Sequence, residues 1–337
     1  MLKDKLQIYL LTYNRKNELH HTLKTLLSET SPIKNAQITI LDNASTDGSS
    51  ELIDDYCEKF QNLKHIRHNI NIGGNANICR ALEMASTCGK KYFWILCDDD
   101  TLKFKHWEKV ENAIKTDKYD CIIVEKKINF KSDDFPNIIN TLSFLPAGIY
   151  KTENINSTVI HNAYSNIMYS FPHLALGCHL LNIKANFYIS KFRIIKQGIN
   201  DSLLKKSNTK NKENDFTRGT NKELHFRSQH INLFSSLINS YQMIQDKKLR
   251  MKCCNTLYIG KSFNYSVYQF LLTNSSKYNM NDFFLGINFK KKFQFVIITI
   301  FYYTILSIIK FEKRKNGIYI NILNKFKTKI IPYKKSK

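Results

Sequence analysis

Short apolar runs alternate with segments of helical pattern through the first 125 residues of the chain. The apolar runs lie at residues 6–11, 37–41, 92–96 and 121–124, residues 62–68 are expected to form a further short strand, and apolar residues recur at helical spacing over 17–27, 49–60 and 77–86. This alternation predicts an α/β domain over residues 1–125, with a mostly parallel sheet between two layers of helices. Ligands of such sheets bind beyond the carboxyl ends of the strands. Polar residues that follow the runs are therefore the first candidates for a functional site.

The rest of the chain is expected to form two further regions. Residues 126–170 have an irregular pattern, and the sequence Ser-Phe-Pro-His at 170–173 precedes a helical pattern over 174–181, which is a typical helix start. Residues 201–223 are polar with few large apolar side chains, which predicts a mobile loop. We therefore expect an acceptor-side region over 126–224 and a mainly helical, basic region over 225–337.

The most apolar stretch, residues 293–309, has basic residues on both sides. As a helix with a rise of ~1.5 Å per residue it would be roughly 25 Å long, which is shorter than the ~30 Å hydrocarbon core of a bilayer. A buried helix, a helix in the plane of the membrane interface and a membrane span are the alternatives. The basic flanks favour peripheral contact of residues 290–315 with an anionic membrane face.

The formal net charge of +23 suggests an anionic partner, such as a phosphorylated substrate, a membrane face or nucleic acid. The eight cysteines form no CxxC pair and several lie in apolar runs, which indicates reduced thiols in a cytoplasmic protein. The first residues lack the apolar core of a signal peptide, in agreement with that location. A nucleic-acid-binding protein would fit the charge. Acidic clusters at strand ends would repel phosphate, however, so we expect no nucleic-acid partner.

Three consecutive carboxylates, Asp98, Asp99 and Asp100, follow the run at 92–96. Adjacent like charges repel one another, and a hard cation such as Mg²⁺ or Mn²⁺ would offset them while bridging to substrate phosphates. Alternate side chains of an extended chain point to the same side, which predicts that Asp98 and Asp100 bind one metal ion. A solvated acidic turn after a strand is the alternative.

Three further polar clusters are candidates for ligand binding. They are Thr12-Tyr13-Asn14-Arg15 after the first run, Asp42 and Asp47 after the second run, and Gly73, Gly74 and Asn77 at the start of the third helical segment. Tyr13 can stack on a base, Arg15 can pair with phosphate, and Asp42 can accept hydrogen bonds from a base or a ribose. A helix cap is the alternative role for Asp47. The glycines permit close approach of a ligand to a helix N-terminus that favours anions.

The order and spacing of these four clusters resemble the family 2 glycosyltransferases over residues 5–125. The resemblance implies the GT-A fold and a nucleotide-sugar donor, with a UDP-sugar as the first expectation. It implies that the clusters after the first two runs hold the nucleotide, that the glycine turn lies near the donor, and that the three aspartates are the DxD motif, which binds metal and diphosphate. Inversion at the sugar follows from the same resemblance. No Q-x-x-R-W motif is present, which favours addition of a single sugar, and the basic C-terminal region suggests a lipid-linked acceptor of lipopolysaccharide or capsule type.

The sequence carries a weaker signal for the catalytic base than for the other parts of the predicted site. Inverting members of the family use a carboxylate, often in a Glu-Asp pair at a helix start, and the corresponding region has no such pair. His173 takes this place by context, since an imidazole titrates near neutral pH, and Asp201 is the second candidate. A capping or core role is the alternative for His173, as a loop turn is for Asp201. A sugar nucleotidyltransferase is the alternative enzyme, although residues 12–18 lack the glycines of a triphosphate-binding loop.

Overall fold

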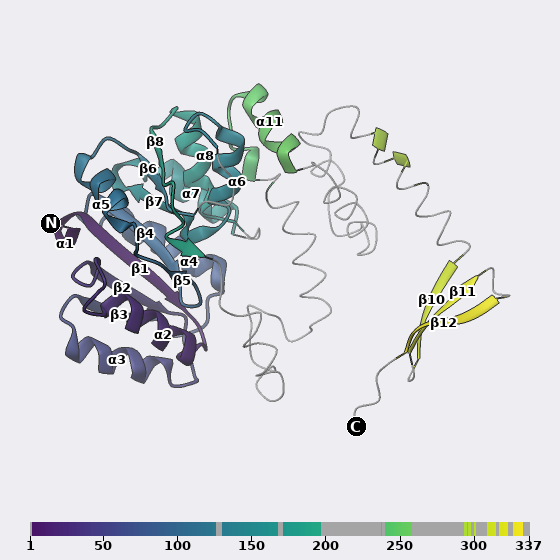
Figure 1. Ribbon diagram of the computed structural model, residues 1–337, viewed down its shortest axis with the longest axis horizontal. Helices are drawn as coiled ribbons and strands as arrows, with labels where there is room; N and C mark the ends of the chain where they lie inside the picture. Colours follow the sequence, from purple (N-terminus) through teal and green to yellow (C-terminus); the bar gives the residue numbers. More distant parts are fainter. Residues whose placement is uncertain are drawn as a thin grey trace. The chain divides into compact units, whose positions relative to one another are not determined.

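The computed structural model describes residues 2–125, 130–167, 171–196, 237, 240–257, 293–294, 296–297, 300, 309–314, 317–322 and 326–332. The chain divides into two compact units, Met1–Thr256 and Leu257–Lys337. The first unit contains the predicted α/β domain (Figure 1).

A seven-stranded sheet with the order β3-β2-β1-β4-β7-β6-β8 forms the centre of the first unit. Its strands are β1 (Leu6–Thr12), β2 (Gln37–Asp42), β3 (Leu63–Arg67), β4 (Tyr92–Cys97), β6 (Cys121–Ile123), β7 (Gly148–Lys151) and β8 (Phe187–Ile189). β1 pairs in parallel with β2 and β4, β2 with β3, and β6 with β8, whereas β7 is antiparallel to both β4 and β6. The carboxyl ends of β1, β2, β4 and β6 therefore lie along one edge of the sheet.

Helices cover both faces of this sheet, as predicted. On one face α2 (Lys16–Leu27), α3 (Ser49–Lys59) and α5 (Trp107–Thr116) share a core with alternate residues of the central strands, such as Ile8 and Trp94. The apolar residues of α2 at helical spacing, among them Leu19 and Leu23, are fully buried in this core. The buried residues of α4 (Gly74–Ser86) lie outside that core, and α4 contacts β1, α7 (Ser157–Ser165) and, through α7, α8 (Leu174–Asn182). The resulting layers are helix, sheet and helix.

Short elements occupy the region that the sequence pattern left irregular. They are α6 (Phe135–Leu142), η1 (Leu145–Ala147), β7, η2 (Thr152–Asn154) and α7. None of them exceeds nine residues, which is too short for a periodicity to identify the element type. Side-chain caps set two of the helix starts, since Asn156 accepts a hydrogen bond from the Val159 N–H at 3.0 Å and Asp134 accepts one from the Asn137 N–H.

The second unit contains a three-stranded antiparallel sheet of β10 (Ile309–Arg314), β11 (Gly317–Ile322) and β12 (Phe326–Pro332). A helical region was predicted over 225–337. It agrees with α11 (Lys247–Leu257) but needs correction over 309–332, where the structure has strands. The missed signal is the Asn316-Gly317 dipeptide, which is typical of a β-hairpin, followed by the isoleucine-rich run at 318–322. The predicted mobile loop at 201–223 lies outside the described residues.

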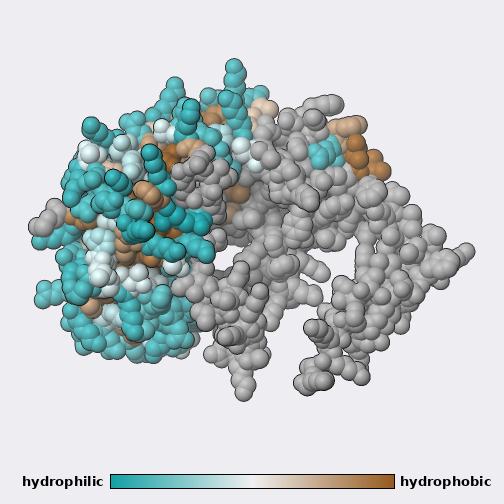
Figure 2. Space-filling model, in the orientation of Figure 1, coloured by the Kyte–Doolittle hydropathy of each residue, from teal (hydrophilic) through white to brown (hydrophobic). Residues whose placement is uncertain are grey.

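The apolar stretch at 293–309 is described at five helical positions and at its last residue, which begins β10. Phe293, Val296, Ile297 and Ile300 expose between 48% and 62% of their surface. Among the residues that the structure describes, no helix has the length and apolar character needed to cross a membrane. The visible face of the first unit, in contrast, is largely hydrophilic (Figure 2).

Candidate active site

The polar clusters predicted after the strands meet at one edge of the sheet. The strand register pairs Thr12 with Asp42 and Leu11 with Cys97, so the ends of β1, β2 and β4 are level. Neighbouring strands lie ~4.8 Å apart, which brings the segments after these three strands within reach of one another's side chains. Tyr13, the candidate for base stacking, lies partly exposed at this edge.

Asp98 is buried and connects these segments through its hydrogen bonds. Its carboxylate accepts a hydrogen bond from Thr12 Oγ1 at 2.7 Å and pairs with Arg15 Nη1 at 3.0 Å, and its carbonyl oxygen accepts one from Thr22 Oγ1 at 2.7 Å. Burial raises the pKa of Asp98 to about 6, while Arg15 and Thr12 act in the opposite direction, so the carboxylate is ionised at neutral pH. Asp98 thus holds Arg15 at the end of β4, and the charged Arg15 offsets part of the negative charge of the cluster.

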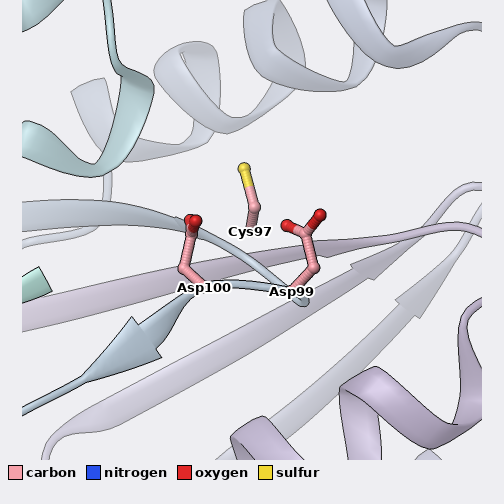
Figure 3. Close-up of side chains that lie close together, drawn as sticks. All are labelled: Cys97, Asp99 and Asp100. Atoms are coloured by element: carbon pink, nitrogen blue, oxygen red, sulfur yellow. The ribbon is translucent and has the colours of Figure 1, made fainter. Parts of the chain in front are cut away.

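Asp99 and Asp100, rather than Asp98 and Asp100, present their carboxylates together. β4 ends at Cys97, and the chain then turns, with the Asp100 N–H directed at the Cys97 carbonyl at 3.5 Å. The alternation expected of an extended chain does not continue through this turn, so the Asp99 carboxylate lies beside that of Asp100. One oxygen each of Asp99 and Asp100 and the sulfur of Cys97 lie within 4.8 Å of one another (Figure 3).

This pair of carboxylates fits a divalent cation. Two adjacent carboxylate oxygens suit Mg²⁺ or Mn²⁺, which commonly complete their coordination with substrate phosphates. Arg15 Nη1 lies 3.0 Å from Asp99 Oδ2, so a cation at this pair would lie beside a fixed positive charge that also suits a diphosphate. Burial raises the pKa of the Cys97 thiol well above its ordinary value, which makes this residue a poor ligand for a hard cation.

Asp42, at the end of β2, is fully buried and ionised. It accepts hydrogen bonds from the Ser45 N–H at 2.9 Å and from Ser50 Oγ at 2.8 Å, and His65 Nε2 lies 3.8 Å away. Burial alone would raise the pKa of Asp42, but His65, Ser45 and Ser50 outweigh it and lower the pKa to about 2. The described contacts of Asp42 order the loop that follows β2, so Asp42 positions this loop. Its contact with a base stays a prediction.

We expect Asp42→Asn to lower the free energy of unfolding by about 2 kcal/mol at pH 7, because the folded state depresses the pKa from 3.8 to about 2. A depressed carboxyl pKa contributes stability above pH ~4, and this contribution is lost as the pH falls through the folded-state value. The difference between wild type and variant should therefore shrink between pH 5 and pH 2. Urea unfolding across this range measures it, with the exposed Asp55→Asn as the control. A difference that stays constant with pH would contradict this origin of the stability.

Asn14 and Asp47 join the loops of the site to one another. Asn14 adopts a left-handed conformation with a φ of 49°, and its N–H donates to Ser45 Oγ at 2.9 Å. Asp47 accepts hydrogen bonds from the Lys16 N–H at 2.9 Å and the Ser49 N–H at 3.0 Å, at the starts of α2 and α3. The helix-start alternative for Asp47 is thus the role that its contacts show.

An asparagine that sequence reasoning missed holds the glycine turn. Asn43 accepts a hydrogen bond from the Ile72 N–H at 2.9 Å and donates one to Asn71 Oδ1 at 2.7 Å. Gly73 has a φ of 86° and a ψ of 151°, a combination almost restricted to glycine, although a Cβ there would meet no heavy atom within 4 Å. The turn therefore leaves open space beside Gly73. Asn43 directly follows Asp42 in one of the predicted polar clusters, and this position is the sequence signal that could have identified it.

The predicted residues Gly74 and Asn77 belong to the first turns of α4, which begins at Gly74. Asn77 is buried, and its side chain bonds to His68 Nε2 at 3.0 Å and to the Leu41 carbonyl at 3.2 Å. These contacts fix the N-terminus of α4 against β2. A helix N-terminus held at this edge is a favourable place for an anionic group.

His173 is a core residue at the start of α8. It is 4% exposed, its Nε2 lies 3.1 Å from the Leu142 carbonyl oxygen, and its ring packs against Phe171. Burial lowers the pKa of His173 to about 4, so the imidazole is neutral and weakly basic. These contacts correspond to the core alternative and give no support to a role as the base. Asp201 lies outside the described residues.

The layered sheet and the carboxylates at its edge define a GT-A glycosyltransferase fold. Residues 8–204 match the model of Glycosyl transferase family 2, more than half of the chain. The chain belongs to this family and is a glycosyltransferase, which replaces the alternatives of a sugar nucleotidyltransferase and a nucleic-acid-binding protein.

Two curated relatives are themselves glycosyltransferases. The chain is 26% identical over 255 residues to abequosyltransferase RfbV of Salmonella typhimurium, a match that covers 66% of this chain and 75% of RfbV. It is 24% identical over 159 residues to the poly(ribitol-phosphate) β-N-acetylglucosaminyltransferase TarP of Staphylococcus aureus, which covers 47% of this chain and 46% of TarP. The chain thus spans less than half the length of TarP.

Solved structures share the fold at low sequence identity. TarS 1–349 of S. aureus in complex with UDP aligns with a TM-score of 0.56 at 14% identity, over 94% of this chain and 96% of TarS 1–349. The mannosyltransferase PcManGT of Pyrobaculum calidifontis in complex with GDP-Man and Mn²⁺ aligns with a TM-score of 0.50 at 11% identity, over 90% of this chain and 86% of PcManGT.

Proposed function

We propose that this glycosyltransferase moves one sugar from a nucleotide-sugar donor to a hydroxyl group of a cell-surface glycan precursor, with inversion at the sugar and with a divalent cation. The observation that carries the proposal is the pair of carboxylates from Asp99 and Asp100 beside Arg15, at the edge where the nucleotide loops meet. The names of RfbV and TarP support a surface-glycan acceptor, and the absence of Q-x-x-R-W supports addition of a single sugar.

The nucleoside of the donor lies along the ends of β1 and β2 in this proposal. Tyr13 stacks on the base, and the loop ordered by Asp42 and Asn43 lies next to it. The open side of Gly73 and the N-terminus of α4 receive the donor from the opposite wall. A UDP-sugar is the donor that we expect first, since TarS has been solved with UDP and with UDP-GlcNAc, while PcManGT holds GDP-Man.

The diphosphate of the donor lies at the end of β4. Asp99 and Asp100 would hold the cation, which offsets the negative charge that develops on the leaving nucleoside diphosphate. Arg15, fixed by Asp98 at 3.0 Å, acts on the same charge from the protein side. The acceptor hydroxyl attacks the anomeric carbon from the face opposite the diphosphate, a new carbon–oxygen bond forms, and the bond to the diphosphate breaks. A protein base takes the hydroxyl proton.

We further infer a peripheral position at the cytoplasmic face of the cell membrane, with residues 290–315 in contact with anionic lipid and a lipid-linked glycan as the acceptor. The support comes from the basic residues on both sides of the apolar stretch and from its exposed Phe293, Val296, Ile297 and Ile300.

The proposal is tested by calorimetry of UDP, GDP and CDP binding to the full chain, with and without Mn²⁺. We expect one of the nucleotides to bind at least tenfold more tightly than the others and to require Mn²⁺, and the corresponding nucleotide sugar to be hydrolysed slowly in the absence of an acceptor. Absence of binding for all three, in protein with a cooperative melting transition, would refute the proposed donor site.

A further inference from the structure

A further buried carboxylate at this edge of the sheet, besides those of Asp42, Asp98 and Asp100, has no part in the site described above. Glu125 is 1% exposed and pairs through Oε1 with both Nε, at 3.0 Å, and Nη2 of Arg193. Its other oxygen, Oε2, is equally buried and has no hydrogen-bond partner within the described part of the chain. An unpartnered carboxylate oxygen away from water is costly, so its retention points to a ligand group that completes it.

The strand register places Glu125 near the aspartates. Trp94 of β4 and Ile122 of β6 both pair with the same residue of β7, and the two strands are parallel. Three residues further along, Cys97 and Glu125 are therefore level, two strand spacings or about 10 Å apart. The ladder continues past β6, because the Val124 N–H donates to the Ala147 carbonyl at 2.8 Å.

Cys97 and Glu125 also project from the same face of the sheet. Trp94, Ile122 and Val124 all lie in the core shared with α2 and α5. Side chains alternate along a strand, so Cys97 and Glu125 point to the opposite face, where α4, α7 and α8 pack. The register therefore places Glu125 on the face of the sheet to which Cys97 projects. Figure 3 shows the Cys97 side chain beside those of Asp99 and Asp100.

A hydrogen-bonded ribbon fixes Arg193 to the aspartate turn. β5 (Thr101–Leu102), which follows the aspartates directly, pairs with β9 (Ile195–Lys196). The Lys103 N–H donates to the Ile194 carbonyl at 2.8 Å, and the Ile194 N–H donates to the Val124 carbonyl at 2.8 Å. The segment that carries Arg193 is thus hydrogen-bonded both to the chain after the aspartate turn and to the segment that carries Glu125.

We propose that Glu125 is the catalytic base that takes the proton of the acceptor hydroxyl, and this inference rests on the proposed inverting transfer. The hydroxyl proton moves to Glu125 Oε2 as the hydroxyl oxygen bonds to the anomeric carbon, and the electron pair of the breaking bond leaves with the nucleoside diphosphate. A base lies ~2.6–3.2 Å from the attacking oxygen, which lies ~3–3.5 Å from the carbon attacked. A separation of about 10 Å between the two strand ends accommodates this line of atoms together with the diphosphate.

Arg193 has a positioning role in this arrangement. Both of its hydrogen bonds go to Oε1, so the guanidinium orients the carboxylate and leaves the Oε2 lone pairs for the acceptor. The arrangement also supplies the carboxylate that is missing from the helix start at 170–173, where His173 is a buried core residue.

The test compares wild type with Glu125→Gln in the hydrolysis of UDP-GlcNAc, GDP-mannose and a CDP-sugar, with water in place of the unidentified acceptor. We expect kcat to fall at least 100-fold for Glu125→Gln, while the calorimetric Kd for the matching nucleotide with Mn²⁺ changes less than twofold. Wild-type kcat at saturating donor and Mn²⁺ should fall at acid pH, because a protonated base cannot take the hydroxyl proton. In Glu125→Gln this acid limb should be absent. Glu153→Gln is the matched control, because Glu153 is a surface carboxylate paired with Lys151, and it should retain wild-type kcat.

Glu125→Asp and Arg193→Gln separate catalysis from structure. Glu125→Asp keeps the charge but withdraws the carboxylate by one methylene, so kcat should fall at least tenfold with the acid limb preserved. This variant decides the question if Glu125→Gln lacks a cooperative melting transition. The assignment is overturned if folded Glu125→Gln retains more than a third of wild-type kcat. It is also overturned if Glu125→Gln keeps the acid limb and loses no more kcat than Arg193→Gln does. Wild type that neither binds nucleotide nor hydrolyses a donor refutes the proposed function itself.

Discussion

Replacement of Asp100 by alanine should reduce the turnover of the nucleotide sugar by about 10³-fold, which corresponds to ~4 kcal/mol of transition-state stabilisation. The substitution removes one of the two carboxylates that would hold the cation against the leaving diphosphate. The ion pairs of Arg15 with Asp98 and Asp99 at the end of β4 remain in this variant. Loss of one of three adjacent negative charges also relieves repulsion in the free protein.

Steady-state hydrolysis of the donor at increasing Mn²⁺ concentration measures this effect. We expect Asp100→Ala to have a low kcat that excess Mn²⁺ does not restore, with a thermal midpoint within a few degrees of wild type. Asp117→Asn is a matched control, because Asp117 is a carboxylate paired with Lys91 and Lys151 before β6, away from the turn after β4. Turnover by Asp100→Ala at more than a tenth of the wild-type rate would contradict its assignment as a metal ligand.

Replacement of Asp98 by alanine, unlike that of Asp100, should lower the free energy of unfolding, by about 3 kcal/mol, and should also reduce turnover. Removal of one member of a buried ion pair costs ~3–5 kcal/mol, because the remaining charge stays without compensation. We expect the lower end of this range, since the Arg15 side chain is 27% exposed and can be partly solvated. Thr12 Oγ1 also loses the acceptor of its 2.7 Å hydrogen bond.

A double-mutant cycle with Arg15→Gln measures the interaction. Asp98→Ala and Arg15→Gln should each destabilise the protein in urea unfolding, and the double variant should be more stable than the sum of the two changes predicts. Additive effects of the two substitutions would show that the pair contributes nothing to the fold. A single-variant loss below about 1 kcal/mol for Asp98→Ala would likewise contradict the anchoring role that we assign to it.

Local periodicity in the sequence was sufficient to identify the sheet domain. The strand at residues 6–11 and the helix at residues 17–27 correspond to β1 and α2 within one residue. The prediction succeeded because a buried strand is continuously apolar and a packed helix repeats its apolar residues every three to four positions, and both signals lie within a dozen neighbouring residues. The shorter elements between β6 and α8 carried no such signal.

The sequence also identified the edge of the sheet that carries the site. The carboxyl ends of neighbouring parallel strands lie close together, whatever the sequence of the helices between them. Asp42 and Asp98 could be assigned to one edge from topology alone, because each follows a predicted strand. Their contacts could not be assigned in this way. Asp42 accepts hydrogen bonds from Ser45 and Ser50, and these bonds depend on the path of a loop.

The sequence by itself thus determined the class of fold, the edge that carries the site and the residue types gathered there, since these follow from periodicity and chain order. Tertiary structure decided which aspartates present their carboxylates together, because the chain turns after Cys97 and Arg15 pairs with Asp98. It also decided that His173 is buried, as a result of packing between α6 and α8. The pairing of Glu125 with Arg193 joins residues 68 positions apart through strands too short to predict. Charge pairing and burial depend on distances across the fold, and no local pattern in the chain encodes them.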